Sequence, residues 1–260
     1  MFFSENNVKI YISYEYEEDY ILASIKEAYD STIGENFTGL KLLIWAIPLY
    51  ICRELYLENS FVFLTFFGGI FGLLLIGFLS ESAFNTIDKK PELIPGINLL
   101  SMAWTGFKTI LAMGLPIAIM YFLGDFLTGL IKIEDPSWKM TADIFVWLFL
   151  AALPVSTYIV FIRRLNVFEA FNLKKVFIAY GDAFMTFSYL IVKLYIFAFL
   201  IIGFITYMFW LFVGLDNPLI NFIWCIAVMY NLTIAANYLA QLSEEVFAFR
   251  ENENGKKSTH

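Results

Sequence analysis

Long apolar runs separated by short polar segments dominate this sequence. Five runs reach the roughly 20 residues that a helix needs to cross a bilayer, and they lie at 61–80, 107–130, 141–162, 188–214 and 218–241. Inside lipid, a helix satisfies every backbone polar group within its own segment, so each run predicts a transmembrane helix. Asn217 and Pro218 mark the start of the last run, as an N-cap followed by proline at the first helical position.

A sixth apolar run at 37–57 contains Lys41 and Arg53. Both charges lie near its ends, where long basic side chains reach the lipid headgroups. The pattern therefore predicts an all-α integral membrane helical bundle of about six transmembrane helices. The expected domains are an acidic N-terminal segment with an amphipathic helix at 1–35, the membrane domain at 36–243, and a charged flexible C-terminal tail at 244–260.

The basic residues predict the orientation of this bundle, because they accumulate on the cytoplasmic side of membrane proteins. With six spans and both termini cytoplasmic, only Arg53, Lys132 and Lys139 of the 17 basic residues lie outside. We therefore expect a multi-pass protein of the cell (cytoplasmic) membrane with both termini in the cytoplasm.

The two internal connections, 81–106 and 163–187, are too long for turns and too apolar for solvated loops. At 100° per residue each contains a polar stripe opposite an apolar face, which is typical of a helix lying on the membrane surface. We expect the two stripes to form a cytoplasmic partner face; they comprise Asn98, Ser101, Thr105 and Lys108 in the first connection and Lys175, Asp182 and Thr186 in the second.

The two connections also resemble each other. Ala83-Phe84-Asn85 matches Ala170-Phe171-Asn172, and a pair of lysines follows each tripeptide. The order of span, surface helix and span occurs twice, which indicates a parallel internal repeat. Spans two and three then correspond to spans four and five.

Several loose motifs give the chain a resemblance to a known family. They are an amphipathic helix at 19–30, the glycines Gly68-Gly69 and Gly77, the turn at 88–93, Leu115-Pro116, and Ala170-Phe171-Asn172. With these motifs the sequence resembles a domain-of-unknown-function family of polytopic archaeal and bacterial membrane proteins, related to the membrane domain of some glycerophosphodiester phosphodiesterases. The resemblance covers almost the whole chain, and it implies an architecture rather than a reaction.

Composition supports lipid as the solvent of this chain, since 60% of its residues are apolar, 19% are aromatic and only 16% are charged. The net charge of −7 comes largely from the two ends, so the chain lacks the basic footprint that nucleic acid requires. Cys52 and Cys225 lie far apart in apolar runs and form no disulfide or metal-binding pattern. We expect no cofactor, no metal and no nucleic-acid partner.

Three prolines lie at similar depth in three predicted spans, roughly 10 to 14 Å from the cytoplasmic ends at about 1.5 Å per residue. Proline kinks helices, so three kinks at one level predict a cytoplasm-facing cavity. The alternative is that these prolines are ordinary, because proline is common in membrane helices. Polar groups of the last span line the same cavity or bond across to neighbouring helices. The candidate cavity-lining residues are Pro48, Pro116, Pro154, Lys193, Thr233, Asn237 and Gln241.

Enzyme chemistry finds little support, since the single histidine is His260 at the end of the chain. An interfacial lipid hydrolase would need a pair of carboxylates, for which Glu81 and Asp88 are the best candidates. This is the least favoured of three possible functions. The first is a non-enzymatic structural or accessory subunit, or scaffold, that docks partner proteins or lipids. The second is a transporter or lipid-handling module with a cytoplasm-facing cavity. The expected partners are membrane lipids and other membrane proteins or a second copy of the chain.

Overall fold

A computed structural model describes residues 24–35, 38–90, 92–197, 207–208, 211–212 and 217–257 of the chain. Within these residues all regular structure is helical. The helices are α1 (Ile25–Gly34), α2 (Thr38–Leu57), α3 (Phe61–Ile87), α4 (Leu99–Leu130), α5 (Pro136–Ile162), α6 (Val167–Ala170), α7 (Leu173–Phe197) and α9 (Pro218–Lys257).

Four of the described helices are long and apolar enough to cross a membrane: α3, α4, α5 and the part of α9 from Pro218 to Phe247. They contain four of the predicted runs, so the described residues confirm an all-helical fold with four candidate membrane-spanning helices. Helix α2 is not among the four, and it carries Lys41, Arg53 and Glu54 within its 20 residues. The predicted span at 188–214 lies largely outside the described residues.

Helix ends differ from the predicted boundaries. Helix α3 continues to Ile87 and α4 begins at Leu99, so the expected surface helix at 81–106 consists of two helix ends joined by a linker, whose described residues 88–90 and 92–98 are not helical. Helix α9 continues to Lys257, where a flexible tail was expected at 244–260. Hydropathy marks only the apolar part of a helix, whereas its actual ends depend on caps and packing.

Side-chain caps fix two of these ends. Asn98 Oδ1 accepts a hydrogen bond from the Ser101 amide at 3.2 Å and starts α4. Asp135 Oδ1 accepts from the amides of Ser137 at 2.8 Å and Trp138 at 3.2 Å, with Pro136 at the first position of α5. These are the residue types preferred at helix N-termini. The second cap also shapes the turn between α4 and α5.

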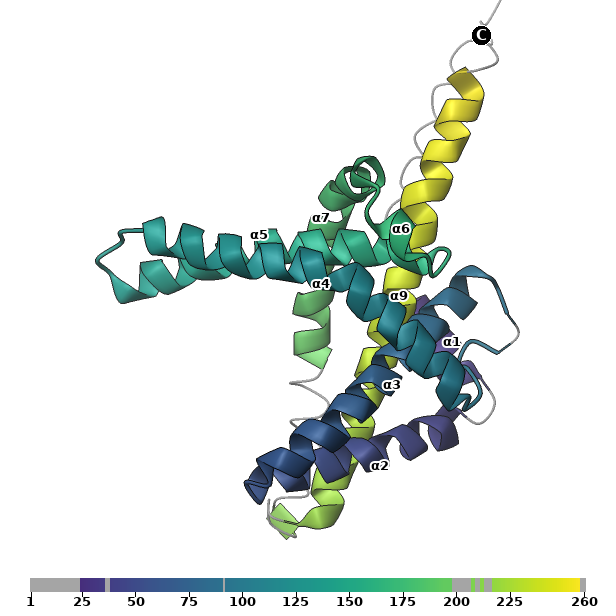
Figure 1. The fold of residues 1–260 in the computed structure, drawn as a ribbon, viewed down its shortest axis with the longest axis vertical. Helices are drawn as coiled ribbons and strands as arrows, with labels where there is room; N and C mark the ends of the chain where they lie inside the picture. Colours follow the sequence, from purple (N-terminus) through teal and green to yellow (C-terminus); the bar gives the residue numbers. More distant parts are fainter. Residues whose placement is uncertain are drawn as a thin grey trace, which may run out of the picture.

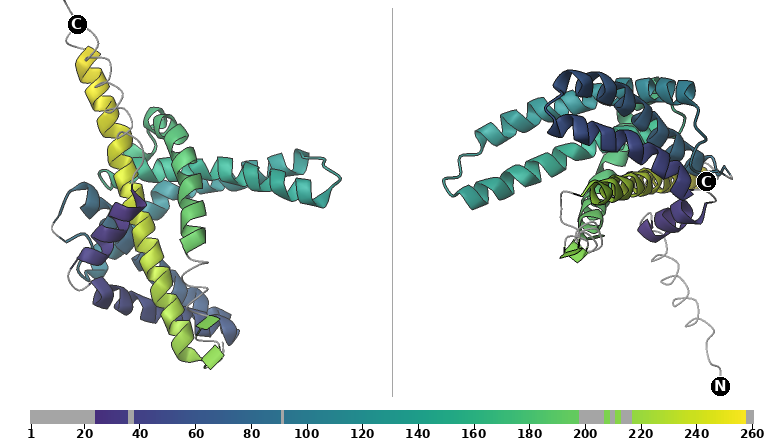
Figure 2. Two further views of the ribbon diagram at one scale, coloured as in Figure 1. Left: turned by 180° about the vertical axis from the view of Figure 1, so that it is seen from behind. Right: turned by 90° about the horizontal axis from the view of Figure 1, so that it is seen from below.

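Helix α9 is the central element, because it packs against α1, α2, α3, α5 and α7. Helices α4 and α5 pack against each other, and their outer halves form a two-helix arm that extends away from α9 (Figures 1 and 2). We call the residues 113–149 the α4–α5 arm. The molecule thus has a centre of crossing helices and one projecting pair.

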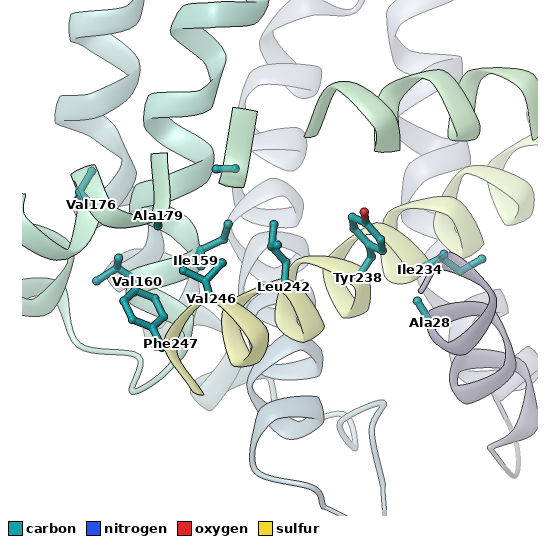
Figure 3. Packing of buried hydrophobic residues seen from close by; sticks show 11 residues of the cluster. Ala28, Ile159, Val160, Val176, Ala179, Ile234, Tyr238, Leu242, Val246 and Phe247 are labelled. Carbon is teal, nitrogen blue, oxygen red and sulfur yellow. The ribbon is translucent and has the colours of Figure 1, made fainter. Parts of the chain in front are cut away.

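Three buried clusters hold the centre together, and α9 contributes to each. In the first, Tyr238, Leu242 and Val246 follow one another along α9, with Ala28 of α1 toward one end and Val160 of α5 toward the other (Figure 3). The third cluster contains both Ala83 and Ala170. The first residues of the two matching tripeptides therefore lie in the same core cluster.

Candidate functional site

Helices α3 and α4 cross with their backbones in direct contact. A Cβ atom added to Gly77 would overlap the carbonyl of Met102, and one added to Gly106 would overlap the carbonyl of Leu73. Only glycine permits this approach. Of the four glycines in α3, Gly69 and Gly72 face open space, so Gly77 is the one that the crossing requires.

This crossing brings Glu81 of α3 against the first turns of α4. Glu81 Oε1 accepts hydrogen bonds from Ser101 Oγ at 2.6 Å and from Thr105 Oγ1 at 2.9 Å. Three residues of the predicted polar stripe, Asn98, Ser101 and Thr105, thus face the polar end of α3. Thr105 is buried in this contact.

The two carboxylates proposed as a hydrolase pair have different partners. Asp88 lies in the turn after α3, and its Oδ2 is 3.8 Å from Lys90 Nζ. Glu81 instead bonds to the two hydroxyls of α4. The described contacts therefore give no support to a catalytic carboxylate dyad.

A polar cavity of about 600 Å³ opens between the end of α3, the linker and the start of α4. That volume is within the range of small-molecule sites, about 300 to 1,000 Å³. Its walls combine carboxylates, a lysine, amides and hydroxyls, and they include Glu81, Asn85, Lys90, Glu92, Asn98 and Ser101. Leu165, from the turn after α5, also borders the cavity, so both internal connections meet here.

An ion pair from the N-terminal part of the chain holds the linker in place. Glu35 Oε1 accepts a hydrogen bond from Lys41 Nζ at 2.9 Å, and both side chains also form hydrogen bonds with backbone groups of Ile94. Lys41 Nζ donates to the Ile94 carbonyl at 2.7 Å, and the Ile94 amide donates to Glu35 Oε2 at 2.8 Å. We call this arrangement the linker clamp. It fixes the segment that forms one wall of the cavity.

Asn85 and Phe84 support the other end of the linker. Asn85 Nδ2 lies 3.3 Å from the carbonyl oxygens of both Glu92 and Leu93, to which it donates. Lys90 Nζ lies over the Phe84 ring, 5.2 Å from its centroid. Phe84 and Asn85, the last two residues of the first matching tripeptide, therefore help to shape the cavity.

An apolar groove of about 200 Å³ lies between α2, α3 and the linker. Its lining includes Trp45, Pro48, Phe71 and Leu74. The linker separates it from the polar cavity: Pro95, Gly96 and Asn98 border the cavity, whereas Ile97 and Leu99 border the groove. A polar site and an apolar site thus lie beside one short segment.

The candidate residues of the predicted proline-kinked cavity lie in different parts of the structure. Pro48 lines the apolar groove, whereas Pro116 and Pro154 are buried inside α4 and α5. Thr233 is buried and donates to the Met229 carbonyl of its own helix at 2.9 Å. Gln241 is half-buried in α9. The side chain of Lys193 lies outside the described residues.

Asn237 is fully buried and joins three helices. Its Nδ2 donates to Thr32 Oγ1 of α1 at 2.8 Å. Its Oδ1 accepts from Ser82 Oγ and Thr86 Oγ1 of α3, both at 3.1 Å. Asn237 therefore bonds to neighbouring helices, which was the alternative prediction to its lining a cavity.

The remaining residues of the predicted partner face are Lys108, Lys175, Asp182 and Thr186, and the first three are not part of the described lining of the polar cavity. Lys108 lies 5.5 Å from the centroid of the Trp104 ring, and Asp182 is exposed on α7. Lys175 Nζ lies 2.7 Å from Glu169 Oε2, and Arg164 lies 2.8 Å from the other carboxylate oxygen. The hydrogen bond from Lys175 holds the pKa of Glu169 below its ordinary value. The side chain of Thr186 is not described.

Several residues of the site could not be assigned to it from the sequence. Glu35, Glu92 and Asn85 enter it only because the linker folds back over the end of α3. Spacing along the chain could not reveal these contacts, since Glu35 and Ile94 are 59 positions apart. Within the described residues, no group of three or more His, Cys, Asp and Glu side chains could hold a metal ion.

Comparison of the sequence with models of known families, with curated proteins and with solved structures gives no match. The fold and the polar cavity therefore supply the evidence on function.

Proposed function

We propose that this chain is a non-enzymatic membrane protein, a scaffold or accessory subunit that docks a lipid or a partner protein at the polar cavity between α3 and α4. The cavity is the observation that carries the proposal. It lies at the ends of two apolar helices, and three residues of the predicted partner face, Asn98, Ser101 and Thr105, border it.

The proposal includes the topology expected from the sequence. In it, α2 and the segment at 188–214 add two spans to the four apolar helices, and both termini are cytoplasmic. The linker and the turn containing Leu165 then lie on the cytoplasmic side of the membrane. The cavity opens at headgroup depth, where lipid headgroups and cytoplasmic proteins are both accessible.

Lipid handling is the second candidate, and the apolar groove favours it. The groove and the cavity border the same linker, so one amphipathic molecule has apolar and polar walls within reach. Transport through the centre of the bundle is less favoured, because Asn237 and Thr233 are buried there among helix contacts.

Gly96 offers a direct test of the docking site. It borders the cavity, and a Cβ atom at this position would have open space around it. The variant Gly96→Trp places a large side chain in the cavity without a clash at Cβ. Wild type and variant are purified in a mild detergent, and the bound lipids and proteins are identified by mass spectrometry.

The matched control is Gly114→Trp, because Gly114 also faces open space but lies on α4 away from the cavity. We expect a lipid or partner to remain bound to wild type and to Gly114→Trp, and to be lost from Gly96→Trp. Equal retention by both variants, or a bare wild-type monomer, would contradict the proposed docking function.

A further inference from the structure

We propose that the polar cavity binds the headgroup of a phospholipid with a primary amine, with the ammonium group on Glu81 and the phosphate on Lys90. This inference rests on the proposed docking function and names its ligand.

Glu81 has one carboxylate oxygen available to a ligand. Oε1 already accepts from two hydroxyls of α4. Oε2 accepts from no donor among the described residues, and it is not one of the buried polar atoms that lack partners. It therefore faces the cavity. An ammonium group there gains a charge-assisted hydrogen bond, which is about twice as strong as a neutral one.

Lys90 supplies the opposite charge on the cavity wall. Its side chain is 46% exposed, and the ion pair with Asp88 is long, at 3.8 Å. The ammonium group of Lys90 is a point charge suited to a phosphate oxygen. The other carboxylate of the lining, Glu92, is paired with Lys41 at 3.5 Å. With a free carboxylate oxygen on Glu81 and an exposed lysine, the cavity matches a zwitterion better than a simple anion or cation.

The cavity favours a primary amine over a quaternary one. A primary ammonium group donates hydrogen bonds, and the walls offer acceptors from Glu81, Asn98 and Ser101. Proteins bind quaternary amines in cages of several aromatic rings. Phe84 is the only aromatic residue in the described lining, and Lys90 already lies over its ring.

The position of the cavity favours a lipid over a free amine. It opens where α3 ends and α4 begins, and the apolar groove lies on the other side of the linker. Residues 97 and 99 face this groove, which gives an acyl chain an apolar surface close to the headgroup site. A soluble amine would use only the polar wall.

A methylation series of lipids tests this inference on the wild-type protein. The protein is placed in phosphatidylcholine nanodiscs doped with phosphatidylethanolamine or with its mono- or dimethyl derivative. Lipid retention is then measured by native mass spectrometry. We expect retention to fall with each added methyl group, to about one-tenth for the choline lipid, because a lost charge-assisted hydrogen bond costs about 1.4 kcal/mol or more. Equal retention across the series would overturn the inference.

The variant Glu81→Gln is expected to remove the preference for the primary amine, whereas Lys90→Gln is expected to weaken all phospholipids equally. Glu134→Gln, in the exposed turn between α4 and α5, is the matched control and should behave as wild type. An unchanged preference in Glu81→Gln would also overturn the inference. Competition by free phosphoethanolamine at equal strength would show that the lipid tail contributes nothing, which contradicts the lipid source.

The inference and the docking function fail in different ways. Loss of a bound partner from Gly96→Trp together with a flat methylation series would reject the amine headgroup and keep the docking site. No loss from Gly96→Trp would reject both.

Discussion

The centre of the molecule and the α4–α5 arm have similar apolar sequences and opposite environments. At the centre, Phe78 and Asn237 are fully buried. In the arm, Phe122 is 79% exposed and Phe145 is 65% exposed. The arm helices pack against each other at Gly124, where an added Cβ atom would lie only 2.5 Å from the Trp147 ring.

The difference shows what holds a membrane fold together. Lipid tails are as apolar as leucine, so burying apolar side chains between helices gains little there. Close backbone approach and buried hydrogen bonds supply the specific energy. Both are concentrated at the centre, at the Gly77–Gly106 crossing and around Asn237. The arm has an apolar surface that lipid or another membrane helix can cover.

The largest effect is expected at the glycine crossing. Gly77→Ala adds one methyl group against the Met102 carbonyl, a backbone atom that cannot move without shifting α4. We expect a loss of about 3 kcal/mol in unfolding free energy, the upper end for overpacking. Thermal unfolding in detergent measures it. Gly69→Ala on the same helix faces open space and should change little; equal losses in both variants would show that helix propensity, not the crossing, is responsible.

The buried hydrogen bonds of Asn237 come next. Asn237→Leu keeps the branching of the side chain at Cγ and removes the acceptor of Ser82 and Thr86 and the donor to Thr32. We expect a loss of about 2 kcal/mol, the usual cost of leaving buried polar groups unpaired. Asn231→Leu is the control, because Asn231 donates only to its own helix, at the Ala227 carbonyl. A stable Asn237→Leu protein would contradict a structural role for the network.

The contrast also explains what the sequence could predict. Hydropathy located α3, α4, α5 and most of α9, because those segments are apolar on nearly every side. It could not place Glu81 against Ser101, since that contact depends on where two helices cross. Gly77 was visible as one of several glycines in its span, but only the three-dimensional crossing distinguishes it from Gly69.

Some site residues were found from sequence because their polarity was unusual for their position. Asn98, Ser101 and Thr105 formed a polar stripe beside an apolar run, and all three border the cavity. The stripe was predicted to form a partner face on the cytoplasmic side, however, because nothing in the local pattern shows that α3 carries a carboxylate opposite it. The linker clamp could not be predicted for the same reason: its two sides lie in different segments.

A smaller loss is expected at the linker clamp. Lys41→Met nearly keeps the length of the side chain and removes its bonds to Glu35 and to the Ile94 carbonyl, together with its ion pair to Glu92 at 3.5 Å. We expect a loss of about 1.5 kcal/mol, the lower range for hydrogen bonds to charged groups, and faster amide exchange across 92–98. Lys132→Met, at an exposed position, is the control. Unchanged exchange in the linker would show that Asn85 alone holds it.

In the second connection, we expect a pH-dependent change in unfolding free energy that is smaller than the loss caused by Lys41→Met. The folded state lowers the pKa of Glu169, chiefly through the hydrogen bond from Lys175. Its contribution to stability is therefore complete above the ordinary glutamate pKa of about 4.3 and disappears as the pH falls through the lower folded-state pKa. Glu169→Gln should melt earlier than wild type at pH 6 and converge with it near pH 3. Glu58→Gln, at an exposed turn, should show no such convergence.

The smallest effect is expected on the outer face of the arm. Phe145→Ala removes a mostly exposed ring, and in a lipid nanodisc the acyl chains replace its contacts at little cost, so the change should stay below about 0.5 kcal/mol. Trp147→Ala, two positions away, removes the ring that packs on Gly124 and Tyr121, and should cost several times more. If the two variants were equally destabilising, another protein surface, and not lipid, would cover Phe145. The arm would then be an interface, and its difference from the centre would reflect a missing partner.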